Sequence, residues 1–219
     1  MFAAVFSGAR FFLDIIFPPS ARETRVRALA PQDMSVSPQT YAFKEHLITT
    51  LMPYRDKGVR DLIWILKYRK TEEAVRLAGG ILADYLLEYA SESRIFGAQT
   101  LILVPIPLSR ERLRERGYNQ SLIVARQAAR EIADKTVLVR ELLIRTKNTK
   151  AQTSLARNER LLNVHGAFSI SPTANLAEVK GAHIVVIDDV STTGATLAEA
   201  AHALKERAPS LSLMALARA

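Results

Sequence analysis

The segment HIVVIDDVSTTGATL, residues 183–197, is the feature that most constrains the fold of this chain. Residues 184–187 are apolar and β-branched throughout, which predicts a strand buried on both faces, as in a parallel sheet. Asp188 and Asp189 follow at the carboxyl end of that strand, where open α/β sheets place their ligand crevices. A Ser-Thr-Gly run then leads into a helical pattern over 195–207, and hydroxyls with free N–H groups at a helix N-terminus suit a phosphate. Because carboxylates beside such a site suit sugar hydroxyls or a divalent cation, the segment predicts a pocket for a phosphorylated sugar.

The rest of the chain alternates strand and helix patterns, which predicts βαβ units and a mostly parallel sheet. An opening amphipathic helix stopped by Pro18 and Pro19 and an irregular segment to residue 40 precede these units. Strand patterns occur at 41–54 (one or two short strands), 100–107, 136–142, 164–170, 184–187 and 211–217. Helical patterns occur at 57–70, 71–90, 121–135 and 195–207. We therefore expect a segment 1–40 and an α/β domain 41–219.

Composition limits the classes of function. The chain of 219 residues has a net charge of +8 and no cysteine, so disulfides, thiolate metal sites and a cysteine nucleophile are excluded. A basic balance favours polyanionic partners, either nucleic acid or phosphorylated small molecules, although it also serves solubility alone. The four histidines lie far apart without ligand spacing and are expected at the surface or at a sheet edge (His46, His165, His183 and His202). The opening segment lacks a signal-peptide pattern and is too short and charged to span a bilayer, so a cytoplasmic protein without stable membrane insertion is expected.

Two further basic segments are candidates for binding. VPIPLSRERLRERGYNQ, residues 104–120, places four arginines after a predicted parallel strand, and guanidinium groups suit phosphate oxygens. The same pattern fits a solvated amphipathic turn in which Glu111 and Glu115 pair with these arginines. The long polar segment 143–163 is either an ordinary surface loop or a functional one. Its basic residues are Arg145, Lys147, Lys150, Arg157 and Arg160.

The 13 residues IVVIDDVSTTGAT resemble the signature of type I phosphoribosyltransferases, which bind 5-phosphoribosyl-1-pyrophosphate. The resemblance implies the type I phosphoribosyltransferase fold, with Mg²⁺ held through the substrate and no metal ligand supplied directly by the protein. Asp188 and Asp189 would then hold the ribose hydroxyls and stabilise the positive ribose in the transition state. The loop Ser191, Thr192, Thr193, Gly194, Ala195 and Thr196 would cradle the 5-phosphate.

The resemblance also assigns the two basic segments. Arg116 and Gly117 would contact pyrophosphate, and residues 41–70 would contribute to a hood that recognises the acceptor. A flexible loop would close over the substrate, with these candidate residues: Arg145, Lys147, Lys150, Gln152, Arg157 and Arg160.

The order of LKYRK, VPIPLSRERLRERGYNQ, RTKNTKAQTSLARNERLLNVHGAF and VIDDVSTTGATL is similar to that of the ComF family, which is associated with natural competence and DNA uptake in bacteria. One departure is clear, because family members commonly carry a cysteine-rich zinc motif after the opening segment FLDIIFPP, and this chain has none. Any role that depends on that zinc module is in doubt.

The resemblance leaves two functions open. The first is transfer of the phosphoribosyl group to a nitrogen acceptor with release of pyrophosphate. The second is a competence protein that contacts single-stranded DNA through its basic segments and uses the sugar-phosphate site for binding or sensing only. Tyr68 and Tyr118 are candidates for base stacking there, although both fit packing roles as well. Proteins of this type frequently form dimers, so a homodimer is also an expectation.

Overall fold

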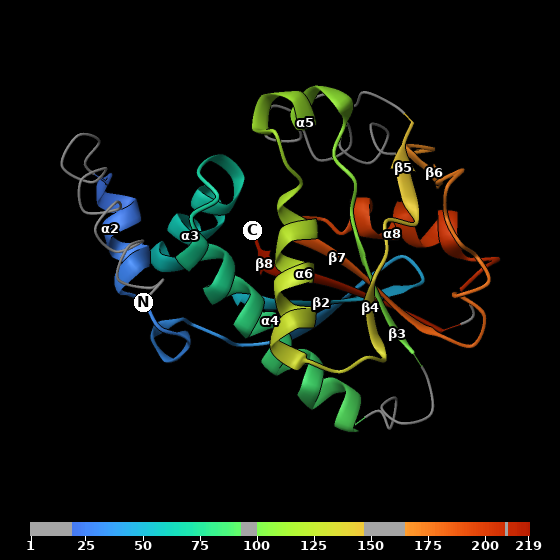
Figure 1. The fold of residues 1–219 in the computed structure, drawn as a ribbon, viewed down its shortest axis with the longest axis horizontal. Coiled ribbons are helices and arrows are strands. Elements are labelled where there is room, and N and C mark those ends of the chain that lie inside the picture. Colours follow the sequence, from blue (N-terminus) through green and yellow to red (C-terminus); the bar gives the residue numbers. More distant parts are fainter. Residues whose placement is uncertain (1–18, 93–99, 147–164, 209) are drawn as a thin grey trace, which may run out of the picture.

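A computed structural model of the chain describes residues 19–92, 100–146, 165–208 and 210–219. Its centre is a six-stranded sheet in the order β1-β2-β8-β7-β3-β4 (Figure 1). The strands are β1 (Gln39–Phe43), β2 (His46–Pro53), β3 (Leu101–Pro105), β4 (Val137–Val139), β7 (His183–Ser191) and β8 (Ser210–Arg218). Neighbouring strands are parallel except β1, which forms an antiparallel hairpin with β2 at one edge. The expected mostly parallel α/β sheet is therefore confirmed.

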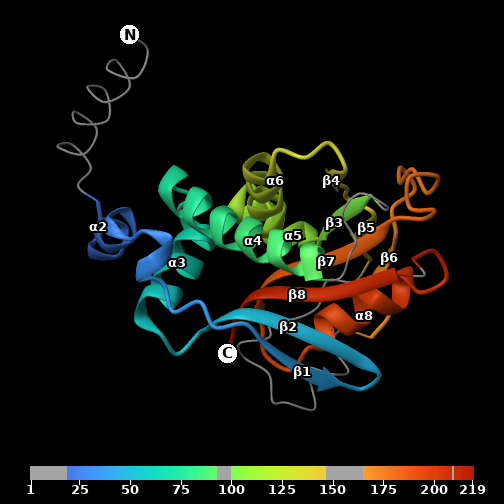
Figure 2. The same ribbon diagram turned by 90° about the horizontal axis from the view of Figure 1, so that it is seen from below.

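Helices cover both faces of this sheet (Figure 2). The helices are α3 (Lys57–Tyr68), α4 (Glu72–Glu92), α5 (Arg110–Arg116), α6 (Gln120–Ile132) and α8 (Ala195–Leu204). On one face α3, α4 and α6 pack on Val185 and Ile187 of β7. On the other face α8 packs on Ile184 and Val186. Successive residues of a strand point to opposite faces of the sheet, and helices cover both faces here, so the four side chains of residues 184–187 are all buried. This explains why the strand is apolar at every one of these positions.

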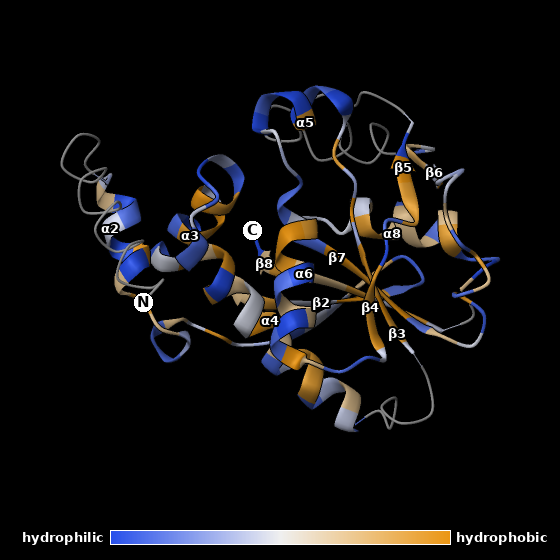
Figure 3. Cartoon of the chain, viewed as in Figure 1, coloured by the Kyte–Doolittle hydropathy of each residue, from blue (hydrophilic) through white to orange (hydrophobic). Residues whose placement is uncertain are grey.

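A smaller antiparallel pair, β5 (Leu143–Arg145) with β6 (Phe168–Ile170), lies beside α8. Strand β5 lies at the start of the long polar segment 143–163, and β6 lies in the strand pattern that follows it. Its predicted loop residues Lys147, Lys150, Gln152, Arg157 and Arg160 lie outside the described residues, as does the predicted opening helix. The basic connection after β3 contains the short helix α5, which is hydrophilic over most of its surface (Figure 3).

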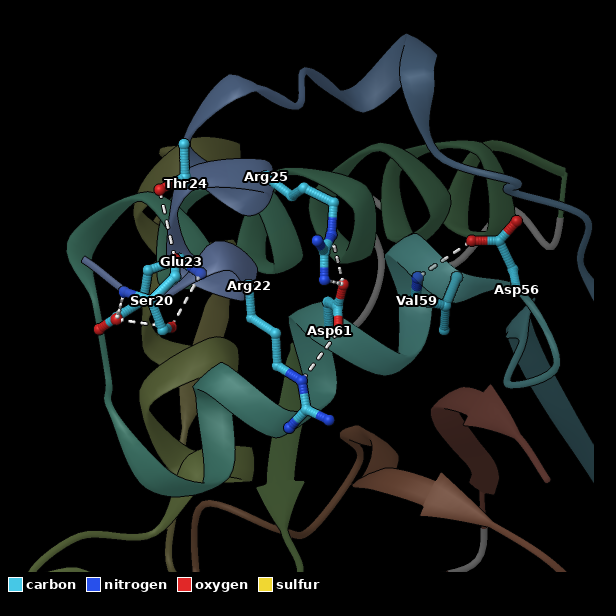
Figure 4. A network of polar contacts seen from close by, with 8 residues as sticks. All are labelled: Ser20, Arg22, Glu23, Thr24, Arg25, Asp56, Val59 and Asp61. Atoms are coloured by element: carbon cyan, nitrogen blue, oxygen red, sulfur yellow. Dashed lines mark hydrogen bonds and ion pairs between the residues drawn. The ribbon is translucent and has the colours of Figure 1, made fainter.

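Residues 18–40 were expected to be irregular, and the structure corrects this. Helix α2 (Ala21–Ala28) begins with a capping box in which Ser20 accepts from the N–H of Glu23 and Glu23 accepts from the N–H of Ser20. Two arginines of α2 meet one buried carboxylate of α3 (Figure 4). Arg25 Nη2 lies 2.7 Å and Arg22 Nε 3.2 Å from the carboxylate of Asp61, which is only 5% exposed. Helix α2 is thus held on α3 by charge as well as by the buried Val26.

The histidine prediction is wrong for His183. This side chain is 5% exposed at the amino end of β7, where its Nε2 lies 3.0 Å from Ser212 Oγ and its Nδ1 hydrogen-bonds Ser210. Burial lowers the pKa of His183, so the neutral ring is the form that suits this hydroxyl network. A residue that begins an inner strand is covered by both neighbours, which the sequence pattern around it did not show.

Candidate active site

The carboxyl ends of β3 and β7 form the switch point of the sheet. The chain leaves β3 through α5 and α6 toward β4, whereas it leaves β7 through α8 toward β8 on the other side. The two strands are direct neighbours, with Pro105 paired to Ile187, and the N–H of Ile106 donates to the carbonyl of Ile187 at 2.9 Å. Because the connections diverge there, the ends of the two strands leave a crevice, which is where ligands of open α/β sheets bind.

A cavity of about 360 Å³ lies in this crevice. It brings together six of the predicted site residues: Asp188, Asp189, Thr192, Thr196, Arg116 and Arg145. Further lining residues, which were not singled out individually as site residues in the sequence, include Tyr54, Lys67, Tyr68, Arg112 and Gln120. The pocket thus joins carboxylates, hydroxyls and guanidinium groups from separate parts of the chain.

The remaining residues of the Thr-Gly loop support the turn. Gly194 has φ +92°, and a Cβ there would lie 2.4 Å from Ile48 Cδ1, so only glycine fits the close approach of β2. Thr193 Oγ1 accepts from the N–H of Ala195 at 3.3 Å. Ser191 is 4% exposed, and its hydroxyl shares a hydrogen bond of 2.6 Å with that of Tyr41. These contacts fix the path of the backbone from β7 into α8.

Gly117 ends α5 in the left-handed conformation, with φ +74° and its N–H donating to the carbonyl of Leu113. This residue turns the chain from α5 toward α6, while the neighbouring Arg116 lines the pocket. Residues 41–53, expected to contribute to a hood, form β1 and β2 of the main sheet. From the range 41–70, the pocket is lined by Tyr54, Lys67 and Tyr68.

The aspartate pair is electrostatically asymmetric. Asp188 Oδ1 accepts a hydrogen bond of 2.8 Å from the N–H of Asp189. Burial, together with the neighbouring Asp189 carboxylate, raises the pKa of Asp188 to about 7. Burial would also raise the pKa of Asp189, but the positive charge of Lys67 outweighs it and the pKa is lowered. Near neutral pH one carboxyl of the pair is therefore held ionised while the other titrates.

Lys67 was covered in the sequence by the expectation that residues 41–70 contribute to a hood, and its contact with the aspartate pair was not predicted. Its Nζ lies 2.9 Å from Asp189 Oδ2, and the two side chains are 23% and 8% exposed. A signal was present in the sequence, because Lys67 follows the buried Ile63 by one helical turn and so lies on the apolar face of α3. A lysine on such a face needs a buried partner.

Arg116 is restrained by two contacts. Its Nη1 donates to Gln120 Oε1 at 3.0 Å, and its guanidinium carbon lies 5.3 Å from the centre of the Tyr68 ring. Its Nε is buried and has no hydrogen-bond partner among the described residues. A partly buried guanidinium whose Nε has no partner among the described residues is suited to an anion that enters the pocket.

The donor set in the pocket is oxygen-rich, but its protein carboxylates are few. No group of three or more histidine, aspartate or glutamate side chains with metal-binding spacing occurs in the part of the chain that the structure describes. Asp188, Asp189 and the threonine hydroxyls supply oxygen atoms that suit hydrogen bonds with the hydroxyls of a sugar.

Comparison with known proteins agrees with this architecture. A family model for the phosphoribosyl transferase domain matches residues 118–218, which include β7, the Thr-Gly loop and α8. Competence protein ComFC of Bacillus subtilis (strain 168) is 40% identical over 192 residues, which are 87% of this chain and 65% of the relative. These matches support a phosphoribosyltransferase-like protein of the ComF family. Its fold is accordingly the type I phosphoribosyltransferase fold.

Other ComF-family relatives match over shorter ranges. Competence protein F of Haemophilus influenzae is 33% identical over 106 residues, covering 48% of this chain and 44% of the relative. The DNA utilization protein YhgH of Escherichia coli (strain K12) is 33% identical over 144 residues, covering 65% of this chain and 59% of the relative. The chain thus spans less than two thirds of the length of these relatives.

Among its described helices, none combines the length and apolar character needed to cross a membrane.

Proposed function

We propose that this protein binds 5-phosphoribosyl-1-pyrophosphate with Mg²⁺ and transfers the phosphoribosyl group to a nitrogen acceptor. The observation that carries the proposal is the single cavity that collects the aspartate pair, Thr192, Thr196 and Arg116 at the switch point. In this assignment Asp188 and Asp189 accept hydrogen bonds from the ribose hydroxyls. Thr192 and Thr196, at the start of α8, donate to the 5-phosphate at the positive end of the helix dipole. Arg116 and Arg145 face the pyrophosphate.

The reaction would form a bond between the acceptor nitrogen and C1 of ribose while the bond from C1 to the pyrophosphate oxygen breaks. Pyrophosphate leaves with the bonding electron pair, and the acceptor nitrogen loses a proton. When bound with the substrate, Mg²⁺ supplies positive charge to the leaving pyrophosphate. The ionised Asp189 stabilises the positive charge that develops on the ribose, and Arg116 offers its free Nε to the pyrophosphate oxygens.

Calorimetric titration tests the binding step. We expect micromolar, Mg²⁺-dependent binding of 5-phosphoribosyl-1-pyrophosphate by the wild type, and a loss of about 100-fold or more in Asp188→Asn/Asp189→Asn because two charge-assisted acceptors disappear. Asp84→Asn, an exposed aspartate on α4, is the matched control and should bind as the wild type does. Absence of binding by the folded wild type would contradict the proposal. Positive binding would be followed by a screen of nucleobases and amines for pyrophosphate release.

The second candidate function is contact with single-stranded DNA in a competence process. Its support is the names of the relatives, two competence proteins and a DNA utilization protein, together with the arginines of α5. Arg110 and Arg114 are exposed on α5, beside Arg112 and Arg116 at the pocket. This arrangement offers a cationic path to a phosphate backbone.

Fluorescence anisotropy with a labelled oligothymidine tests the DNA candidate. We expect binding to weaken by about tenfold or more between 50 and 200 mM salt, since phosphate contacts release counterions. Arg110→Glu/Arg114→Glu should weaken it further at low salt while leaving 5-phosphoribosyl-1-pyrophosphate binding unchanged, because neither residue lines the pocket. Unchanged oligonucleotide affinity in this variant would remove α5 from the DNA-binding surface.

A further inference from the structure

Two consecutive residues at the end of α3 each contact a different predicted ligand group. Lys67 reaches Asp189, which lies near the carboxyl end of β7, and Tyr68 contacts Arg116, which ends α5 in the connection after β3. All four residues line the same cavity. One turn of one helix therefore contacts both sides of the switch point, the end of β7 and the connection after β3, although α3 itself belongs to neither.

The Lys67 contact is a largely buried ion pair. Burial by itself would lower the pKa of Lys67, but the Asp189 carboxylate outweighs this effect and the pKa is raised. The nearby positive charge of Arg116 lowers the pKa of Lys67, so the Asp189 carboxylate is the main group that keeps Lys67 protonated in the pocket. In return, the positive charge of Lys67 helps to hold the pKa of Asp189, which is only 6% exposed, below its usual value.

The Tyr68 contact concerns the face of its ring. Tyr68 is 56% exposed, but Trp64 lies 5.4 Å from it, centroid to centroid, and the Arg116 guanidinium lies 5.3 Å from its centre. The ring is therefore a support for a cation, a contact that strengthens where water is excluded. With Gln120 holding Nη1, the guanidinium is fixed at two points, and its Nε stays unbonded among the described residues.

We propose that the last turn of α3 is a positioning element of the phosphoribosyl site, in which Lys67 holds the Asp189 carboxylate and Tyr68 holds the Arg116 guanidinium. This inference rests on the proposed function for its ligand. Lys67 and Tyr68 then have different roles, because each orients a different ligand-binding group. Neither of them needs to touch the reacting atoms. Prealigned charges cost less to order when the ligand binds, so loss of either support weakens binding without removing a ligand group.

The role is tested by titrating 5-phosphoribosyl-1-pyrophosphate, in the presence of Mg²⁺, into the wild type and four variants. Lys67→Met and Tyr68→Leu should each raise the Kd about tenfold or more, since the cost of ordering one charged group returns. Tyr68→Phe keeps the ring and should stay within about twofold of the wild type. Lys57→Met, an exposed lysine in the first turn of the same helix, is the control for loss of one positive charge. Equal Kd values for Tyr68→Leu and Tyr68→Phe would overturn the Tyr68 assignment.

A readout without ligand distinguishes a failure of this inference from a failure of the proposed function. Carboxyl-detected NMR follows the titration of Asp189 in the wild type and in Lys67→Met. We expect the Asp189 pKa to rise in the variant, because burial is then unopposed, and to stay unchanged in Lys57→Met. A wild type that does not bind the ligand refutes the proposed function, but the shift in Asp189 still decides the Lys67 contact. An unchanged Asp189 pKa in folded Lys67→Met would overturn it.

Discussion

Gly194→Ala is expected to lower the free energy of unfolding by about 3 kcal/mol, through the sum of backbone strain and overpacking. The residue has φ +92°, a conformation that L side chains rarely adopt. A methyl group there would also lie 2.4 Å from Ile48 Cδ1 and 3.1 Å from Phe43 Cβ. Since Ile48 is fully buried and Phe43 belongs to β1, relief requires the turn into α8 to move. The same movement should weaken binding of a 5-phosphate at Thr192 and Thr196.

Chemical denaturation measures this effect, and the chain offers a matched glycine. Gly80 lies inside α4, and a Cβ there would meet nothing within 4 Å. Gly80→Ala should raise the free energy of unfolding by about 0.5–1 kcal/mol, because alanine favours the helix. The two identical substitutions are thus expected to have opposite signs. Equal stability of Gly194→Ala and the wild type would show that the turn has room that this geometry does not provide.

Asp188→Asn is expected to stabilise the fold while it removes a ligand group. The pKa of Asp188 is raised from 3.8 to about 7, mainly by burial, so folding favours its neutral form. The stability that this neutral form provides is complete below the unfolded pKa and is lost as the pH rises through about 7. Asparagine stays neutral and can still accept from the N–H of Asp189. We therefore expect the variant to gain about 2 kcal/mol over the wild type at pH 8 and less at pH 5.

Urea denaturation at the two pH values, with Asp84→Asn as the exposed control, measures this difference. The control should match the wild type at both. A variant that is less stable than the wild type at pH 8 would mean that the Asp188 charge is stabilised in the fold. If Asp188→Asn is more stable but binds 5-phosphoribosyl-1-pyrophosphate more weakly, Asp188 is a residue that serves binding and destabilises the fold.

The strand and loop of the site were predictable because their signals are local. The buried run 184–187, the acidic pair and the Thr-Gly turn follow one another in the sequence, and the structure confirms a buried β7 followed by α8. The signal for helix α2 was also local, since Ser20 and Glu23 have the spacing of a capping box. Pro18 and Pro19 just before it favoured an irregular segment, so this helix was not predicted. The strand predicted at 136–142 is shorter in the structure, β4 ending at Val139.

The contacts made by α3 could not be predicted in the same way. Lys67 meets Asp189 only because the crossover from β2 to β3 carries α3 over the sheet to the end of β7. The periodicity of α3 indicated a buried face, but not which strand end that face would reach. Tyr68 was considered for base stacking or for packing, and the structure shows its ring in contact with Arg116. Long-range pairing depends on strand order, which a single sequence does not encode locally.

Because the chain diverges after β3 and β7, two independent segments line the pocket, the turn after β7 and the connection after β3. The turn from β7 into α8 is closed by Gly194 against Ile48, so its length has little freedom. The connection from β3 to α6 lies on the opposite side of the switch point and can lengthen or shorten without touching that turn. Arg112 and Arg116 would move with it, while the aspartates and threonines kept their places. Such an arrangement would let the length of the connection after β3 change while the residues at the end of β7 stay in place.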